Sequence, residues 1–186
     1  LDSFSGWQWE ELAAQIGQEG QGRVALVGLA GAGKSLLFNR LRGWVLSPSL
    51  ARLGEQTEPY LEWFGAFVLA DLPEELDMAA GELLSGLGDV ALVVYLLDGA
   101  IGVRRADYRW ISLFRARGLP LVVVLNKCDL PGDRDEVRAQ AKHRLGMPVM
   151  PISAYTGENL EERLLPAMLD AAPRLAVALG REIEAL

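Results

Sequence analysis

The sequence predicts an α/β domain of three layers, in which an open, mostly parallel sheet carries helices on both faces. Two observations lead to this fold class. Apolar runs typical of strands alternate along the chain with segments of helical periodicity. Val90–Leu97 and Leu119–Leu125 are almost continuously apolar, as expected for strands that bury both faces. The length of 186 residues suits one domain with short extensions.

The chain divides into three parts. Residues 1–21 are an N-terminal extension with an amphipathic helix, residues 22–170 form the main domain, and residues 171–186 form a C-terminal helix. We expect this last helix to pack back on the domain or to lead into a further module of a longer chain. In the main domain the predicted strands are Arg23–Val27, Tyr60–Phe64, Ala66–Leu69, Val90–Leu97, Leu119–Leu125 and Pro148–Ile152. The predicted helices are Lys34–Leu41, Ala79–Leu87, Arg104–Arg117, Asp135–Leu145 and Asn159–Leu169.

Composition excludes several classes of function. The formal net charge of -7 argues against broad nucleic-acid binding through a basic surface. The single cysteine, Cys128, allows neither an intrachain disulfide nor a cysteine zinc cluster. The sequence shows no signal peptide and no apolar run of transmembrane length. We expect a cytoplasmic location, and peripheral membrane association through parts outside this chain stays open.

The strongest functional motif is a glycine-rich loop after the first predicted strand. Residues 28–35 match G-x-x-x-x-G-K-[ST] in full and lead into a predicted helix. The glycines let backbone N–H groups point at phosphate oxygens, and the helix start adds its positive dipole end. Lys34 supplies charge to the β- and γ-phosphates, and the Ser35 hydroxyl is placed to bind Mg²⁺. The predicted nucleotide-binding residues here are Gly28, Ala30, Gly31, Ala32, Gly33, Lys34, Ser35 and Leu36.

A second motif, Asn126-Lys127-Cys128-Asp129, indicates which base is bound. It follows an apolar strand, at the carboxyl edge where open α/β sheets bind ligands. A carboxylate such as Asp129 accepts from both the ring N–H and the exocyclic amine of guanine, whereas adenine presents no such donor pair. A backbone N–H at Ser153-Ala154, after the last predicted strand, can donate to the guanine carbonyl. We therefore add Asn126, Lys127, Asp129, Ser153 and Ala154 to the nucleotide-binding set.

Together these motifs resemble the translation-factor-like class of P-loop GTPases, and most of all the Era/TrmE type of small bacterial G domain. The resemblance covers roughly residues 22–170 and rests on Gly28–Ser35, Thr57, Asp71, Asn126–Asp129 and Ser153-Ala154. It implies the P-loop NTPase G-domain fold, with a six-stranded sheet that includes one antiparallel strand. It also implies binding of GTP and GDP, with slow GTP hydrolysis that uses Mg²⁺.

The resemblance assigns further roles to residues of the two switch segments. Thr57 corresponds to the switch threonine that contacts Mg²⁺ and the γ-phosphate, with Ser47 and Ser49 as weaker alternatives. Asp71 corresponds to the aspartate that holds a Mg²⁺-bound water. The predicted metal ligands are thus Ser35, Thr57 and Asp71, and the candidate catalytic residues are Lys34 and Thr57.

The second switch departs from the family pattern. Glu74 stands where the family's Asp-x-x-Gly motif has its glycine. A carboxylate there opposes contact with the γ-phosphate unless it points away or is paired. The sequence therefore predicts either weak discrimination between GTP and GDP or a second switch that lies elsewhere between Leu72 and Gly86.

Three functions fit these residues. We favour a guanine-nucleotide switch with low intrinsic GTPase activity, for which an unidentified protein effector or activator supplies the group that orients water. The alternative, motivated by Glu74, is a GTP- or GDP-binding interaction module with negligible turnover. An ATP-dependent kinase or ATPase is disfavoured by Asn126 and Asp129.

Overall fold

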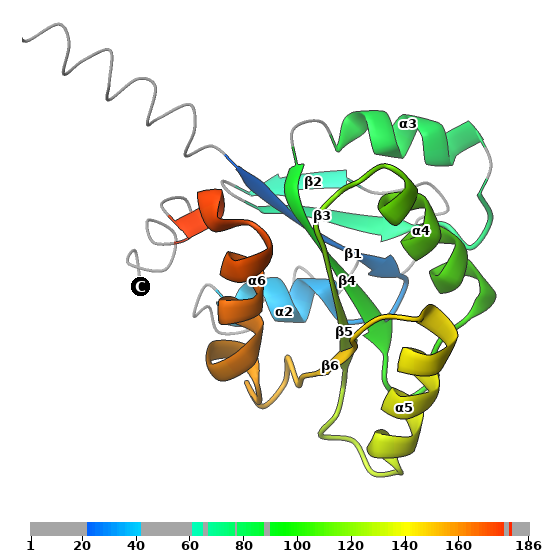
Figure 1. The fold of residues 1–186 in the computed structure, drawn as a ribbon, viewed down its shortest axis with the longest axis vertical. Coiled ribbons are helices and arrows are strands. Elements are labelled where there is room, and N and C mark those ends of the chain that lie inside the picture. Colours follow the sequence, from blue (N-terminus) through cyan, green and yellow to red (C-terminus); the bar gives the residue numbers. More distant parts are fainter. Residues whose placement is uncertain are drawn as a thin grey trace, which may run out of the picture.

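The computed structural model describes residues 22–41, 61–64, 67–76, 78–87, 90–176 and 179. At its centre is a six-stranded sheet with the strand order β2-β3-β1-β4-β5-β6 (Figure 1). All neighbouring strands are parallel except β2 and β3, which are antiparallel. The predicted α/β fold with a mostly parallel sheet is confirmed. The strands are β1 (Arg23–Leu29), β2 (Leu61–Phe64), β3 (Phe67–Leu72), β4 (Val90–Asp98), β5 (Leu121–Asn126) and β6 (Met150–Pro151).

Helices cover both faces of this sheet. Buried side chains of α3, α4 and α5 share one hydrophobic core with the sheet. Buried side chains of α2 and α6 share a second core on the opposite face. The sheet is therefore the middle of three layers (Figure 1). The helices are α2 (Lys34–Leu41), α3 (Met78–Gly86), α4 (Arg105–Ala116), α5 (Arg134–Leu145) and α6 (Leu165–Ala171).

The central strand β4 shows why apolar runs without alternation predicted this architecture. Val93, Tyr95 and Leu97 belong to the core under α3, α4 and α5. Their neighbours Leu92, Val94 and Leu96 belong to the core under α2 and α6. Successive side chains of a strand point to opposite faces, so a strand between two cores must be apolar at every position.

The chain returns to the start of the sheet after α6. Leu175 lies in a short 3-10 helix (Pro173–Leu175) and is fully buried, and Leu179 is also buried in the same core. A Cβ on Gly22, just before β1, would lie 3.0 Å from Leu175 Cδ2. Leu175 is therefore part of the packing around the first strand.

Several elements differ from the sequence expectations in their bounds. Strand β1 continues through Leu29, two residues into the glycine-rich loop, and β3 extends through Leu72, so Asp71 lies within a strand. Strand β6 is limited to Met150–Pro151. The predicted helix Asn159–Leu169 begins as a π-helix (Leu160–Leu164), and α6 continues it.

Several predictions lie outside the described residues. These are the N-terminal helix, the switch residue Thr57 with its alternatives Ser47 and Ser49, and most of the C-terminal helix. Across the described parts of the chain, no helix is long and apolar enough to cross a membrane.

Candidate functional site: a phosphate loop and a base-recognition motif at one sheet edge

The residues singled out in the sequence come together at the carboxyl ends of the parallel strands. The loop after β1 leads into α2, and Asp71 pairs in register with Gly28 across β1 and β3. Asn126 ends β5, and Ser153 follows β6. This is the edge at which open α/β sheets bind ligands.

Backbone geometry at the loop depends on its glycines. Gly31 and Gly33 have φ values of +80° and +94°, which side chains rarely allow. A Cβ on Gly28 would lie 2.5 Å from the carbonyl oxygen of Leu96 on β4. The loop can therefore curl tightly, with Ala30 and Gly31 exposed to solvent. Exposed backbone in this conformation forms a concave surface suited to an anion.

Lys34 begins α2 and points its ammonium back into the loop. Its Nζ donates to the carbonyl oxygens of Gly28 and Leu29, both at 2.9 Å, and forms an ion pair with Asp71. Lys34 is 6% exposed. Burial lowers the pKa of this ammonium below its usual value, and the Asp71 carboxylate opposes the shift. A buried cation at the mouth of an anion-binding loop is suited to phosphate.

Asn126 connects the two predicted parts of the site. Its Nδ2 donates to the carbonyl oxygen of Ala32 at 2.9 Å, and its Oδ1 accepts from the backbone N–H of Ala154 at 2.9 Å. The side chain is 1% exposed. A Cβ on Gly33 would lie 2.4 Å from Asn126 Nδ2, so the close approach requires glycine. One buried amide thus fixes the phosphate loop relative to the loop after β6.

Asp129 lies beside Ser153. Ser153 Oγ donates to Asp129 Oδ1 at 2.6 Å, and Oγ itself accepts from the backbone N–H of Thr156 at 3.0 Å. Ser153 is fully buried, whereas Asp129 is exposed. The serine therefore orients a carboxylate that still has acceptor capacity for a ligand.

Lys127 has a partner that the sequence analysis did not single out. Its Nζ lies 2.7 Å from Oδ2 of Asp98, the last residue of β4. Asp98 is 5% exposed and also accepts from the backbone N–H of Ala100 at 2.8 Å. Lys127 has a positive φ of 65°. Asp98 lies opposite Asn126 in the β4–β5 register, so its place at a strand's carboxyl end was the available signal.

The second switch segment also has unpredicted partners. Glu74 is 74% exposed and lies 3.3 Å from the guanidinium of Arg104, the residue before α4. Trp110 Nε1, on α4, donates to the carbonyl oxygen of Pro73 at 2.9 Å. The predicted ligand Thr57 lies outside the described residues.

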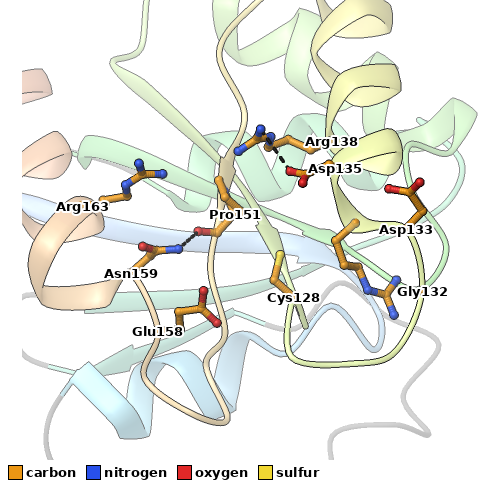
Figure 2. Close-up of a pocket in the computed structure, with 10 residues that line it drawn as sticks. Cys128, Gly132, Asp133, Asp135, Arg138, Pro151, Glu158, Asn159 and Arg163 are labelled. Carbon is orange, nitrogen blue, oxygen red and sulfur yellow. Dashed lines mark hydrogen bonds and ion pairs between the residues drawn. The ribbon is translucent and has the colours of Figure 1, made fainter.

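A pocket of about 720 Å³ lies behind the base-recognition motif (Figure 2). Its lining includes Cys128, the one residue of the Asn126–Asp129 motif for which the sequence predicted no ligand contact. Acidic and basic side chains from α5 and from the segment after β6 also line the pocket. Arg138 pairs there with Asp135 at 3.2 Å, and Asn159 donates to the Pro151 carbonyl oxygen at 3.0 Å. Burial raises the pKa of the Cys128 thiol, which keeps it protonated near neutral pH.

Comparison with known proteins identifies relatives of this chain. Residues 76–174 match the family of the Elongation factor Tu GTP binding domain. The chain is 30% identical over 171 residues to GTPase Der of Bradyrhizobium sp. (strain ORS 278), an alignment covering 80% of this chain and 37% of that protein. This chain therefore spans well under half the length of the curated relatives it matches.

Solved structures share the fold at low sequence identity. A probable GTP-binding protein, engB, is 19% identical with a TM-score of 0.57, and the match covers 80% of this chain and 99% of that one. A GTP-binding protein from Sulfolobus solfataricus, in complex with GDP, is 20% identical with a TM-score of 0.56, covering 90% and 58%. Since the family match takes in more than half of the residues, this chain belongs to the family of the Elongation factor Tu GTP binding domain, with the P-loop GTPase fold.

Proposed function

We propose that this domain is a guanine-nucleotide switch that hydrolyses GTP slowly with Mg²⁺ and depends on a protein partner for full activity. The observation that carries the proposal is the buried Asn126 amide, which holds the phosphate loop against the segment of Ser153 and Ala154. Binding of one ligand by both segments requires this fixed spacing. The finer resemblance to the Era/TrmE type of bacterial G domain is part of the same proposal.

Base selection is assigned to Asp129. Ser153 holds one carboxylate oxygen at 2.6 Å, which supports an orientation that receives the two N–H groups of guanine. Lys127, fixed by Asp98, packs its aliphatic part along the base. The backbone N–H groups of Ser153 and Ala154 donate to the Glu158 carbonyl oxygen and to Asn126 Oδ1 in this structure, so contact of either with the guanine carbonyl would require one of these bonds to be exchanged. Adenine would leave the carboxylate without its two donors, and an unpaired desolvated group is costly.

Phosphate binding is assigned to the loop and the first turn of α2. The backbone N–H groups of the loop and of the first turn of α2 would donate to a bound phosphate chain, in a loop conformation that the positive φ values of Gly31 and Gly33 allow. The N–H of Ala32 donates within the loop, to the Leu29 carbonyl oxygen at 3.2 Å. Lys34 adds a charge-assisted contact, and the start of the eight-residue helix α2 adds its dipole. These groups spread the negative charge that develops during attack of water on the γ-phosphate.

The donor atoms near Lys34 fit a magnesium ion. Ser35 offers a hydroxyl in the first turn of α2, and Asp71 offers a carboxylate that is 24% exposed, directly across from Gly28. Hard oxygen donors next to substrate phosphates are the usual environment of Mg²⁺. Thr57 completes the proposed ligand set. When bound, the ion neutralises phosphate charge and orients the phosphate chain.

The described residues offer little to orient the attacking water, and this supports slow hydrolysis and a partner. In the described ranges the only glutamine and histidine are Gln140 and His143, both on α5, where Gln140 donates to Glu136. A group supplied by another protein is an established way to complete such a site. We place this switch and its partner in the cytoplasm.

Two measurements on the same protein test the proposal. Titration with GDP, GTP and ATP in Mg²⁺ should show binding of both guanine nucleotides and little competition by ATP. Single-turnover hydrolysis of GTP should then give a slow but measurable rate that is lost on chelation of Mg²⁺. Binding without turnover would favour the interaction module that Glu74 suggests, and preference for ATP would contradict the assignment of the base site.

A further inference from the structure

The segment that follows Asp71 is attached to α4 at two points. The buried indole of Trp110 donates to the carbonyl oxygen of Pro73 at 2.9 Å. One residue further along, Glu74 pairs with the guanidinium of Arg104 at 3.3 Å. The backbone contact sets where the segment lies, and the ion pair sets where the Glu74 carboxylate points.

Arg104 is held in place by the protein core. Asp107, which is 1% exposed, accepts from the Arg104 backbone N–H at 2.8 Å and lies 3.5 Å from its Nε. The other carboxylate oxygen of Asp107 accepts from the hydroxyl of Tyr95 at 2.9 Å, and Tyr95 is fully buried in the central strand β4. The Arg104 side chain is 25% exposed and therefore reaches the surface from a fixed, buried support.

Arg104 and Glu74 also lie near the phosphate loop. Asp71, the ion-pair partner of Lys34, is three residues before Glu74 in the same segment. The charge of Arg104 is close enough to lower the pKa of Lys34, although less than burial does. A carboxylate released from Arg104 would therefore be free to move toward the place where phosphates bind, and it would repel them.

We propose that Arg104 is a positioning residue for nucleotide discrimination: by pairing with Glu74 it draws that carboxylate onto α4 and neutralises it, so that a third phosphate can be accommodated. The inference rests on the proposed function of the site. This pairing explains how Glu74 can replace the glycine of the family's Asp-x-x-Gly motif without excluding GTP. The effect is on ligand choice, because so exposed an ion pair contributes little to stability.

A double-mutant cycle tests this directly. The four proteins are the parent, Arg104→Met, Glu74→Gln and the double variant, and methionine keeps the apolar stem of the arginine. The readout is the ratio of the dissociation constants for GDP and GMPPNP in Mg²⁺. We expect Arg104→Met to reduce the preference for GMPPNP about tenfold, with GDP affinity changed less than twofold. Glu74→Gln in the same background should restore the parent ratio.

Thermal stability separates positioning from a structural role. Arg104→Met leaves Asp107 with one partner fewer, so its melting temperature should fall, and Glu74→Gln should not restore it. The matched control is Arg105→Met, because Arg105 is the exposed next residue and has no ion pair within the described part of the chain. This control should leave the nucleotide ratio unchanged.

The possible results have distinct meanings. If Arg104→Met weakens GDP and GMPPNP equally, or if Glu74→Gln fails to restore the ratio, Arg104 does not act through Glu74 and the inference is overturned. If Arg105→Met changes the GDP-to-GMPPNP ratio as much as Arg104→Met does, the inference is also overturned, because the change would then reflect net charge alone. If the parent binds neither nucleotide, the proposed function itself fails, and this is visible before any variant is compared.

Discussion

At the scale of single residues, Asp129 is the most direct test of the base site. Asp129→Asn keeps the shape of the side chain but cannot accept from two guanine donors at once, and its own N–H₂ group would face one of them. We expect GDP binding to weaken by roughly 2–4 kcal/mol, with preference shifted toward xanthine nucleotides. Isothermal titration with GDP and XDP measures both effects.

The control for this variant is Asp135→Asn, because Asp135 is close in sequence, is 89% exposed and pairs only with Arg138. The same loss of charge there should leave GDP affinity nearly unchanged. Equal losses in both variants would mean that Asp129 acts through net charge rather than through hydrogen bonds to the base.

The lowered pKa of Lys34 leads us to predict that nucleotide binding depends on pH. Because burial lowers its pKa, the free protein loses this proton at a lower pH than an ordinary lysine does. Phosphate favours the charged form, so binding takes up a proton above that lowered pKa, and affinity for GDP falls as pH rises through it. Titrations that run from neutral pH up to the range in which ordinary lysine ionises should show this fall.

Lys34→Arg supplies the comparison, because a guanidinium stays charged throughout this range. Its affinity for GDP should be lower overall but should change less with pH than that of the parent. Parallel pH curves for the two proteins would show that another group causes the dependence and would remove Lys34 from the proposed phosphate site.

At the scale of elements, the Asn126 side-chain amide links the phosphate loop to the loop after β6 through two hydrogen bonds. Asn126→Ala leaves the Ala32 carbonyl and the Ala154 N–H buried without a partner. At about 1–3 kcal/mol for each of the two unsatisfied groups, we expect the free energy of unfolding to fall by about 2–6 kcal/mol. Urea unfolding of the nucleotide-free protein measures this loss.

Asn126→Asp distinguishes the two hydrogen bonds. It keeps the acceptor for Ala154 and loses the donor to Ala32, where it also places a carboxylate against a carbonyl oxygen. This variant should bind GDP weakly even where it remains folded. Full retention of nucleotide binding in both variants would show that the two loops keep their spacing without Asn126.

These elements also show what could be predicted from the sequence. The strands β4 and β5 could be predicted because each packs between two cores and is therefore almost continuously apolar. The phosphate loop after β1 could be predicted because its glycines and lysine form a local sequence motif. The pairs Lys127–Asp98 and Glu74–Arg104 were not predicted. They join residues 29 and 30 positions apart, and such contacts depend on strand register and helix placement rather than on any local pattern.

At the scale of the whole molecule, the segment after α6 contributes to the core of the domain. Leu175 is fully buried beside the start of β1. Leu175→Ala removes apolar contacts and leaves a cavity, for which we expect a loss of about 2–4 kcal/mol in the free energy of unfolding. Chemical denaturation, with the exposed neighbour Arg174→Ala as control, measures the effect. A change as small as that of the control would show that the segment is not needed for stability.

The ribosome synthesises β1 before any other strand of the sheet. In the folded domain, however, β1 lies in the interior of the sheet, between β3 and β4. The glycines and Lys34 therefore leave the ribosome long before Asn126, which supplies the buried donor to the Ala32 carbonyl. The second hydrogen-bond partner of Asn126, the backbone N–H of Ala154, is synthesised only after β6. A nascent chain that stops within β4 has the phosphate loop but neither its support nor the residues that choose the base. We therefore expect nucleotide binding to arise late in synthesis, after the segment that follows β6 has been made.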